Sequence, residues 1–106
     1  MLKIILTGAL GGDATVKDVG SKKAINFNVA VSMDYKDHEG KKVEKTEWVK
    51  AVIWKYEGRS VKIADYLKKG RRVLIEGIPE SEAYMTKGDE VRSSLHVIVK
   101  EIEFLD

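Results

Sequence analysis

The sequence predicts a small all-β domain, a five-stranded barrel with one short helix between its third and fourth strands. Three observations predict it. Apolar and polar residues alternate with a period of two along most of the chain, a single segment has helical spacing, and that segment follows the third predicted strand. At 106 residues the chain is long enough for one core and too short for two, so residues 1–106 are expected to form one domain.

The chain opens with a short apolar strand, residues 2–7, which we expect to end at Gly8. Residues 8–13 are rich in glycine but lack the Gly-Lys-Ser/Thr ending of a phosphate-binding loop. A bend between strands is therefore the favoured interpretation, and a brief extended piece at residues 14–18 follows it.

Residues 24–32 show the most regular alternation in the protein. One face carries apolar side chains such as Phe27 and Val29, and the other carries small polar ones such as Asn26 and Asn28. The first face is predicted to be core. The second can face solvent or leave room for a ligand to approach the backbone.

The longest predicted strand, residues 46–56, contains both tryptophans. Trp48, Lys50 and Trp54 fall on one face, and an aliphatic set suited to a core falls on the other. The two indoles are roughly 20 Å apart along the strand, with a lysine between them. Rings alternating with a positive charge suit a polyanion that carries stackable bases. Burial of both rings in a second layer is the alternative that periodicity leaves open.

After residue 56 the spacing becomes helical. Val61, Ala64 and Leu67 recur along one side, Ser60 is a plausible N-cap, and Lys-Lys-Gly at 68–70 supplies cations and a stop signal. These features predict the only helix, about three turns long.

The last third of the chain returns to strand. Residues 71–78 form one strand, residues 79–89 read as a polar loop, and residues 91–105 form the final strand, with a bulge or bend after Val99. Five strands with one helix in this interval match the oligonucleotide/oligosaccharide-binding (OB) fold, a Greek-key barrel whose central strands and loops bind single strands.

Composition excludes several classes of function. The chain has no cysteine, and its histidines, His38 and His96, are far apart without carboxylates at ligand spacing, so we expect no metal, no cofactor and no enzymatic activity. No apolar run is long enough to span a membrane and no signal peptide is evident, so a cytoplasmic location is expected.

Several blocks of the sequence together resemble the bacterial single-stranded-DNA-binding protein family. They occur in the family's order over almost the whole chain: ILTGALGGD at 5–13, NFNVA at 26–30, TEW at 46–48, ADYLKKG at 64–70, VLIEG at 73–77 and IEFL at 102–105. Each block is weak alone, and the ordered set is specific.

The resemblance implies sequence-independent binding and protection of single-stranded DNA during replication, recombination or repair. It also implies a homo-oligomer, usually a tetramer in the family, with a dimer as the alternative. The family's stacking aromatics correspond to Tyr35, Trp48, Trp54 and Tyr84 in this chain, which places both tryptophans on the binding surface and not in a second core layer.

Basic residues near these rings are candidates for neutralising phosphates, although ordinary surface charge also explains each one singly. The candidate cations are Lys50, Lys3, Lys22, Lys23, Arg71 and Arg72.

Two departures from the family pattern bear on function. Residues 79–83 are Pro-Glu-Ser-Glu-Ala where basic residues are usual, and their carboxylates would repel phosphates next to Tyr84. Family members commonly continue into an acidic tail that recruits replication and repair enzymes, and this chain stops at Asp106, so it is either truncated or naturally tail-less, and recruitment is not expected. The alternative function is an oligomeric OB-fold protein-interaction module, such as a primosome or mobile-element accessory factor, with weak nucleic-acid binding.

Overall fold

The computed structural model describes residues 1–85, 87–88 and 91–106, and for 82–85 and 91–93 it describes the backbone alone. Over these residues most of the chain is strand. In chain order the elements are β1 (Ile4–Leu10), β2 (Thr15–Val19), β3 (Lys22–Ser32), β4 (Tyr35–Lys36), β5 (Lys42–Val43), β6 (Thr46–Tyr56), the 3-10 helix η1 (Lys62–Tyr66), β7 (Arg72–Met85) and β8 (Val91–Phe104).

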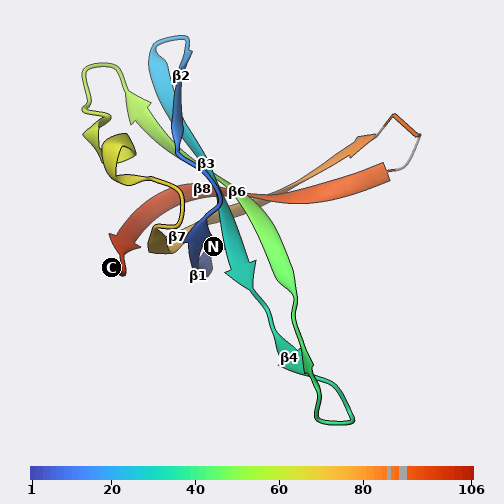
Figure 1. Ribbon diagram of the computed structural model, residues 1–106. Coiled ribbons are helices and arrows are strands. Elements are labelled where there is room, and N and C mark those ends of the chain that lie inside the picture. The colour runs from blue at the N-terminus through green and yellow to red at the C-terminus, as the bar shows by residue number, and fades with distance from the viewer. Residues whose placement is uncertain (86, 89–90) are drawn as a thin grey trace.

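Five of the strands close into a barrel, which confirms the predicted OB fold (Figure 1). The order around the barrel is β1, β3, β6, β8, β7 and back to β1, with β6 and β8 parallel and the other neighbours antiparallel. β1 and β2 both pair with β3, on either side of the glycine-rich bend. The bend therefore lets one stretch of chain serve two parts of the same sheet.

The two faces of β6 separate as the alternation predicts. Val49, Ala51 and Ile53 are buried in the core, whereas Trp48 is 57% exposed and Trp54 is 40% exposed. The core is completed by aliphatic residues of the other barrel strands together with Phe27. The tryptophans are therefore not needed to fill the barrel, and the alternative of a second buried layer is wrong.

Two glycines allow the barrel to close. A Cβ on Gly8 of β1 would collide with the carbonyl oxygen of Ala30 on β3, and a Cβ on Gly77 of β7 would collide with the carbonyl oxygen of Ile98 on β8. The prediction that the first strand ends at Gly8 is therefore wrong, because β1 continues past Gly8 to Leu10. Glycine serves here for close backbone approach and not as a strand breaker.

The predicted bulge in the last strand is confirmed. Glu76 pairs with Glu101 and Gly77 pairs with Val99, so Lys100 is an extra residue on β8. The shift restores an inward direction to the apolar residues that follow, and Ile102 and Phe104 pack against the core.

The predicted helix exists at the expected place, but its type and length differ. η1 is a five-residue 3-10 helix and not a three-turn α-helix. The recurring residues 61, 64 and 67 are three apart, a spacing that also fits the three residues per turn of a 3-10 helix. Leu67 then leaves the helix to enter the core fully buried, and its carbonyl accepts the backbone N–H of Ala14 at 2.8 Å. This tertiary anchor ends the helix early.

The predicted loop at 79–89 is mostly strand. β7 and β8 stay paired from Ile78 opposite Ile98 to Met85 opposite Val91, and they form an arm that projects from the barrel (Figure 1). An arm outside the barrel has no core face. The β7 half of the arm therefore lacks the apolar alternation by which strands are recognised, whereas the predicted strand at 91–105 corresponds to β8.

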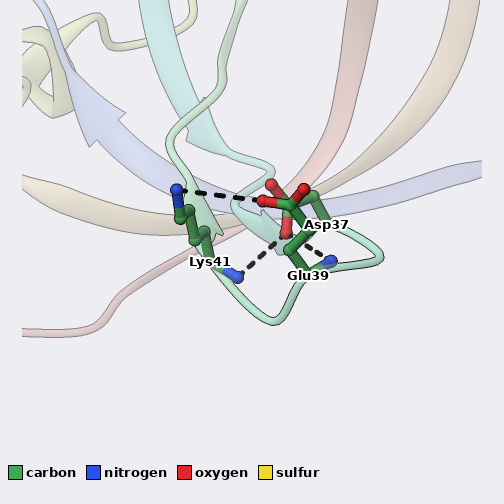
Figure 2. Close-up of polar contacts among 3 residues, drawn as sticks. All are labelled: Asp37, Glu39 and Lys41. Carbon is green, nitrogen blue, oxygen red and sulfur yellow. Dashed lines mark hydrogen bonds and ion pairs between the residues drawn. The ribbon is translucent and has the colours of Figure 1, made fainter.

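A second arm, β4 and β5, projects in another direction, and polar contacts order its tip (Figures 1 and 2). The Asp37 carboxylate accepts the backbone N–H groups of Glu39 and Lys41, both at 2.9 Å. Gly40 turns the chain with a positive φ of 80°, a conformation that glycine adopts without strain. At the base of the arm, the backbone N–H of Lys45 bonds the Asp34 carboxylate and lowers the pKa of Asp34 below its ordinary value.

Among the described residues, no helix has the length and apolar character needed to cross a membrane.

Candidate nucleic-acid interface

A cleft of about 560 Å³ lies on the outer face of the sheet formed by β3, β6 and β8. Lys50 and Trp54 of β6 line it together with Asn28 of β3, His96 of β8 and Glu80 of β7. Alternation along β3, β6 and β8 directs the first four of these side chains outward, because at least one chain neighbour of each points into the core. Glu80 lies in the arm, opposite His96. The small polar face predicted for residues 24–32 thus forms one wall of a cleft.

Trp48 lies on the same outer face, two residues before Lys50, and rests against the glycine-rich bend. A Cβ built on Gly11 would lie 2.5 Å from Cζ3 and 2.8 Å from Cη2 of the Trp48 indole. The bend therefore holds one side of the ring, while 57% of the residue stays exposed. Such support presents an aromatic surface with little loss of rotamer freedom when a ligand binds.

Gly11→Ala is expected to displace the Trp48 ring, because the new methyl group would overlap two of its carbon atoms. We expect a changed Trp48 emission spectrum in the free protein. Gly12→Ala is a matched control, since a Cβ on Gly12 has no heavy atom within 4 Å. Emission is measured in both variants on a Trp54→Phe background, where Trp48 is the remaining tryptophan. An unchanged spectrum in Gly11→Ala would contradict the contact.

Trp54 stands between two clefts. It lines the cleft described above and also a second one of about 780 Å³ at the end of β6. The lining of the second cleft includes Lys22, Lys55, Tyr56 and Lys100. Lys22 Nζ lies 5.2 Å from the centroid of the Tyr56 ring, within cation–π range. An aromatic ring with several ammonium groups around it is suited to a base and its neighbouring phosphates.

The other two predicted aromatics lie on the arms. Tyr35 is in β4 and is 54% exposed. Tyr84 is in β7, in register with Arg92, and its side chain lies outside the part that the structure describes. Trp48 and Trp54 therefore share one strand, whereas Tyr35 and Tyr84 belong to separate projections of the barrel.

The predicted cations differ in their surroundings. Lys50 lines the first cleft together with Trp54, and Lys22 lines the second cleft, whereas Lys23 lies 4.0 Å from Asp18. Lys3 lies on the β1 and β7 side of the barrel, 2.7 Å from Glu76. Its hydrogen bond to that carboxylate raises the pKa of Lys3 and lowers the pKa of Glu76.

The two arginines gather at the start of β7 around one carboxylate. Arg71 Nε lies 3.3 Å and Arg72 Nε lies 3.6 Å from the Asp106 side chain, and the Arg71 guanidinium also lies over the Phe104 ring. Glu80 is eight positions along β7 from Arg72, so the arginines are remote from the cleft. The structure does not bring Lys3, Arg71 or Arg72 together with the tryptophans.

Sequence reasoning missed several residues that line the two clefts. Lys17 on β2, Lys55 on β6 and Lys100 on β8 lie beside the predicted residues. Tyr56 is 66% exposed, with the Lys22 ammonium over its ring. Strand register alone could have indicated Lys17, because it lies opposite Ala24, the partner of Trp54. Lys100 could not be placed, since the bulge decides its direction.

In the part of the chain that the structure describes, no group of three or more His, Cys, Asp or Glu side chains is placed to hold a metal ion. Among the described residues, the two clefts are lined by aromatic rings, ammonium groups, amides, aliphatic side chains, the Ser21 hydroxyl, the His96 imidazole and the Glu80 carboxylate.

Comparison with known sequences matches nearly the whole chain to one family. The sequence model of the "Single-strand binding protein family" matches residues 1–105. The "Single-stranded DNA-binding protein" of Neisseria meningitidis is 35% identical over 105 residues, which are 97% of this chain and 59% of that protein. The "Single-stranded DNA-binding protein 1" of Chlorobaculum tepidum is 42% identical over 77 residues, covering 71% of this chain and 46% of that protein. The chain thus spans about half of these curated relatives.

Solved structures with the same fold include one with a nucleic acid. "Plasmodium falciparum SSB complex with ssDNA" has a TM-score of 0.79 and 28% identity, covering 100% of this chain and 96% of that one. The small single-stranded DNA-binding protein from Streptomyces coelicolor has a TM-score of 0.76 at 16% identity, covering 97% and 93%. At that identity the likeness is one of fold.

Proposed function

The chain belongs to the single-strand binding protein family, and we propose that it binds single-stranded DNA with little dependence on base sequence. The observation that carries the proposal is the outer face of β6. Two exposed indoles, Trp48 and Trp54, flank Lys50 on a barrel whose core is complete without them. A likeness at 28% identity to a solved complex with single-stranded DNA supports the same reading.

In the proposed complex, bases stack on the tryptophans and phosphates lie near the lysines. Trp48, Trp54 and Tyr35 provide exposed rings, and each base–aromatic stack contributes on the order of 1 to 3 kcal/mol. Lys50 and Lys22 are the predicted cations that line the two clefts. We propose Tyr84 as a further stacking residue. Lys3, Lys23, Arg71 and Arg72 already face carboxylates and would contribute less.

We propose that the biological role is coating and protecting single strands exposed during replication, recombination or repair in the cytoplasm. Stacking discriminates poorly among bases, which suits a protein that must cover any exposed sequence. The alternative of a protein-interaction module is not favoured, because the family match extends over residues 1–105 and the exposed rings have a direct use in nucleic-acid binding.

We also propose that the protein is a homo-oligomer, with a tetramer favoured. On the outer face of β1 and β7, Ile5 is 62% exposed and Ile78 is 40% exposed, beside the Lys3–Glu76 ion pair. Leu2 is 70% exposed at the same end of the barrel. Such an apolar surface is typical of an interaction site. It adjoins the tryptophan face, because Ile78 lies opposite Ile98, which lines both clefts.

The function is tested by adding oligothymidine to the protein at low salt while following tryptophan emission. We expect strong quenching that reverses as salt is added, with a slope of log affinity against log salt of roughly −0.7 per phosphate neutralised. A folded protein whose emission does not change at low salt would contradict the proposal.

The subunit number is measured separately, by sedimentation of the free protein. We expect a mass well above the 11.9 kDa of one chain, and a lower mass in Ile5→Asp. A mass near 11.9 kDa for the unmodified protein would contradict the oligomer but not the binding of DNA.

A further inference from the structure

Four polar side chains form a row across the interface, one from each of four neighbouring strands. Asn28 of β3 is in register with Lys50 of β6, Lys50 with His96 of β8, and His96 with Glu80 of β7. Neighbouring strands lie about 4.8 Å apart, so the row is roughly 15 Å long. All four residues line the cleft of about 560 Å³. The row thus places an amide, an ammonium, an imidazole and a carboxylate side by side.

The row lies between the two tryptophans. Along β6, Lys50 is two residues from Trp48 and four from Trp54, which corresponds to roughly 7 Å and 13 Å of strand. A nucleotide chain that stacks on both rings must therefore cross the row. This step rests on the proposed function, since it assumes that single-stranded DNA contacts both tryptophans.

Charge is unevenly distributed across the same cleft. Its lysines, Lys17 and Lys50, come from β2 and β6, whereas Glu80 comes from β7 on the other side of β8. Within the described part of the chain, Glu80 makes no ion pair, and it is the only carboxylate that lines this cleft. A carboxylate repels phosphates and attracts N–H donors. The phosphates are therefore expected on the lysine side, which leaves the base edges facing Glu80.

We propose that Glu80 is a specificity residue that favours bases with an exocyclic amino group over bases with a carbonyl at the same position. An ionised carboxylate can only accept hydrogen bonds. Cytosine presents its N4 amino group as a donor, whereas thymine and uracil present O4 as an acceptor and would meet Glu80 with like partial charges. The protein therefore has a built-in base bias within an otherwise tolerant interface.

Oligodeoxycytidine and oligodeoxyuridine of equal length provide the test, because their bases differ at this edge and neither carries the thymine methyl group. Binding of labelled strands is followed by fluorescence anisotropy at mildly alkaline pH, for the unmodified protein and for Glu80→Gln. Glutamine keeps the size, removes the charge and adds an amide donor that can reach O4. Glu103→Gln is the matched control, an exposed carboxylate near the end of β8 that does not line the cleft.

In Glu80→Gln we expect tighter binding of both strands and a larger gain for deoxyuridine. The ratio of the two dissociation constants, deoxyuridine over deoxycytidine, is expected to fall about three- to tenfold, and Glu103→Gln is expected to leave it unchanged. An equal gain for both strands, or no change in the ratio, would overturn the proposal, since Glu80 would then act as a bulk charge. If the folded unmodified protein binds neither strand, the proposed function itself fails.

Discussion

Trp54→Ala is expected to weaken the binding of single-stranded DNA by about 5- to 150-fold, the equivalent of 1 to 3 kcal/mol for one lost base stack. We expect a large effect at Trp54 because its ring lines both clefts. Each cleft also holds a cation, Lys50 in the first and Lys22 in the second. It contributes little to the core, since Ile53 and Val49 on the opposite face fill the barrel. The loss should therefore appear in affinity and not in stability.

The measurement uses anisotropy of a labelled oligothymidine, because Trp54→Ala also removes one of the two intrinsic fluorophores. Trp54→Phe is expected to recover part of the affinity, since a smaller ring can still stack. Tyr66→Ala is a matched control: Tyr66 is 57% exposed, lies in η1 near Phe104 and lines neither cleft. Equal affinity in Trp54→Ala and Tyr66→Ala would remove Trp54 from the interface.

Gly77→Ala is expected to destabilise the protein by about 1 to 3 kcal/mol, the usual cost of overpacking. The added Cβ would collide with the carbonyl oxygen of Ile98 and lie 2.9 Å from Cγ1 of Val97. Neither the Val97 side chain nor the Ile98 carbonyl can move away easily, because Val97 is fully buried and Ile98 is held in the parallel pairing of β6 with β8. The strain falls where β7 and β8 change register, so it acts on barrel closure itself.

Thermal unfolding at a fixed protein concentration measures this effect, and a fall of roughly 4–8 °C in Tm per kcal/mol is expected for a domain of this size. Gly12→Ala again provides the control, because a Cβ there would have no heavy atom within 4 Å and its φ is not in the left-handed range. Its Tm should equal or slightly exceed that of the unmodified protein. A Tm for Gly77→Ala as high as that of Gly12→Ala would contradict the account of closure.

Much of the barrel could be predicted from local alternation. The two faces of β6, the buried face of β3 and the bulge near Lys100 all follow from which residues are apolar at every second position. The outer part of β7 could not, because this half of the arm has no core face and therefore no apolar period. The type of η1 could not be predicted either, since a spacing of three residues fits both an α-helix and a 3-10 helix.

The candidate site also has a part that the sequence predicts and a part that it does not. Trp48, Lys50 and Trp54 could be placed on one face from the sequence, because all three lie on one strand and strand periodicity is local. The sequence could not show which of the predicted cations lie near the tryptophans and which are paired with carboxylates. Lys3 meets Glu76, and Arg71 meets a carboxylate 35 residues away, through pairings that no local pattern reports.

By itself, the sequence determined that this chain is a β-barrel with two tryptophans and a lysine on the outside of its longest strand. That much depends on the order of apolar and polar residues along single strands. Only the tertiary structure decided which residues are the spatial neighbours of these three side chains. Examples are Gly11, which lies against Trp48, and the row of polar side chains that ends at Glu80. The reason is physical: neighbours across a sheet are set by register and closure, which join residues far apart in the chain.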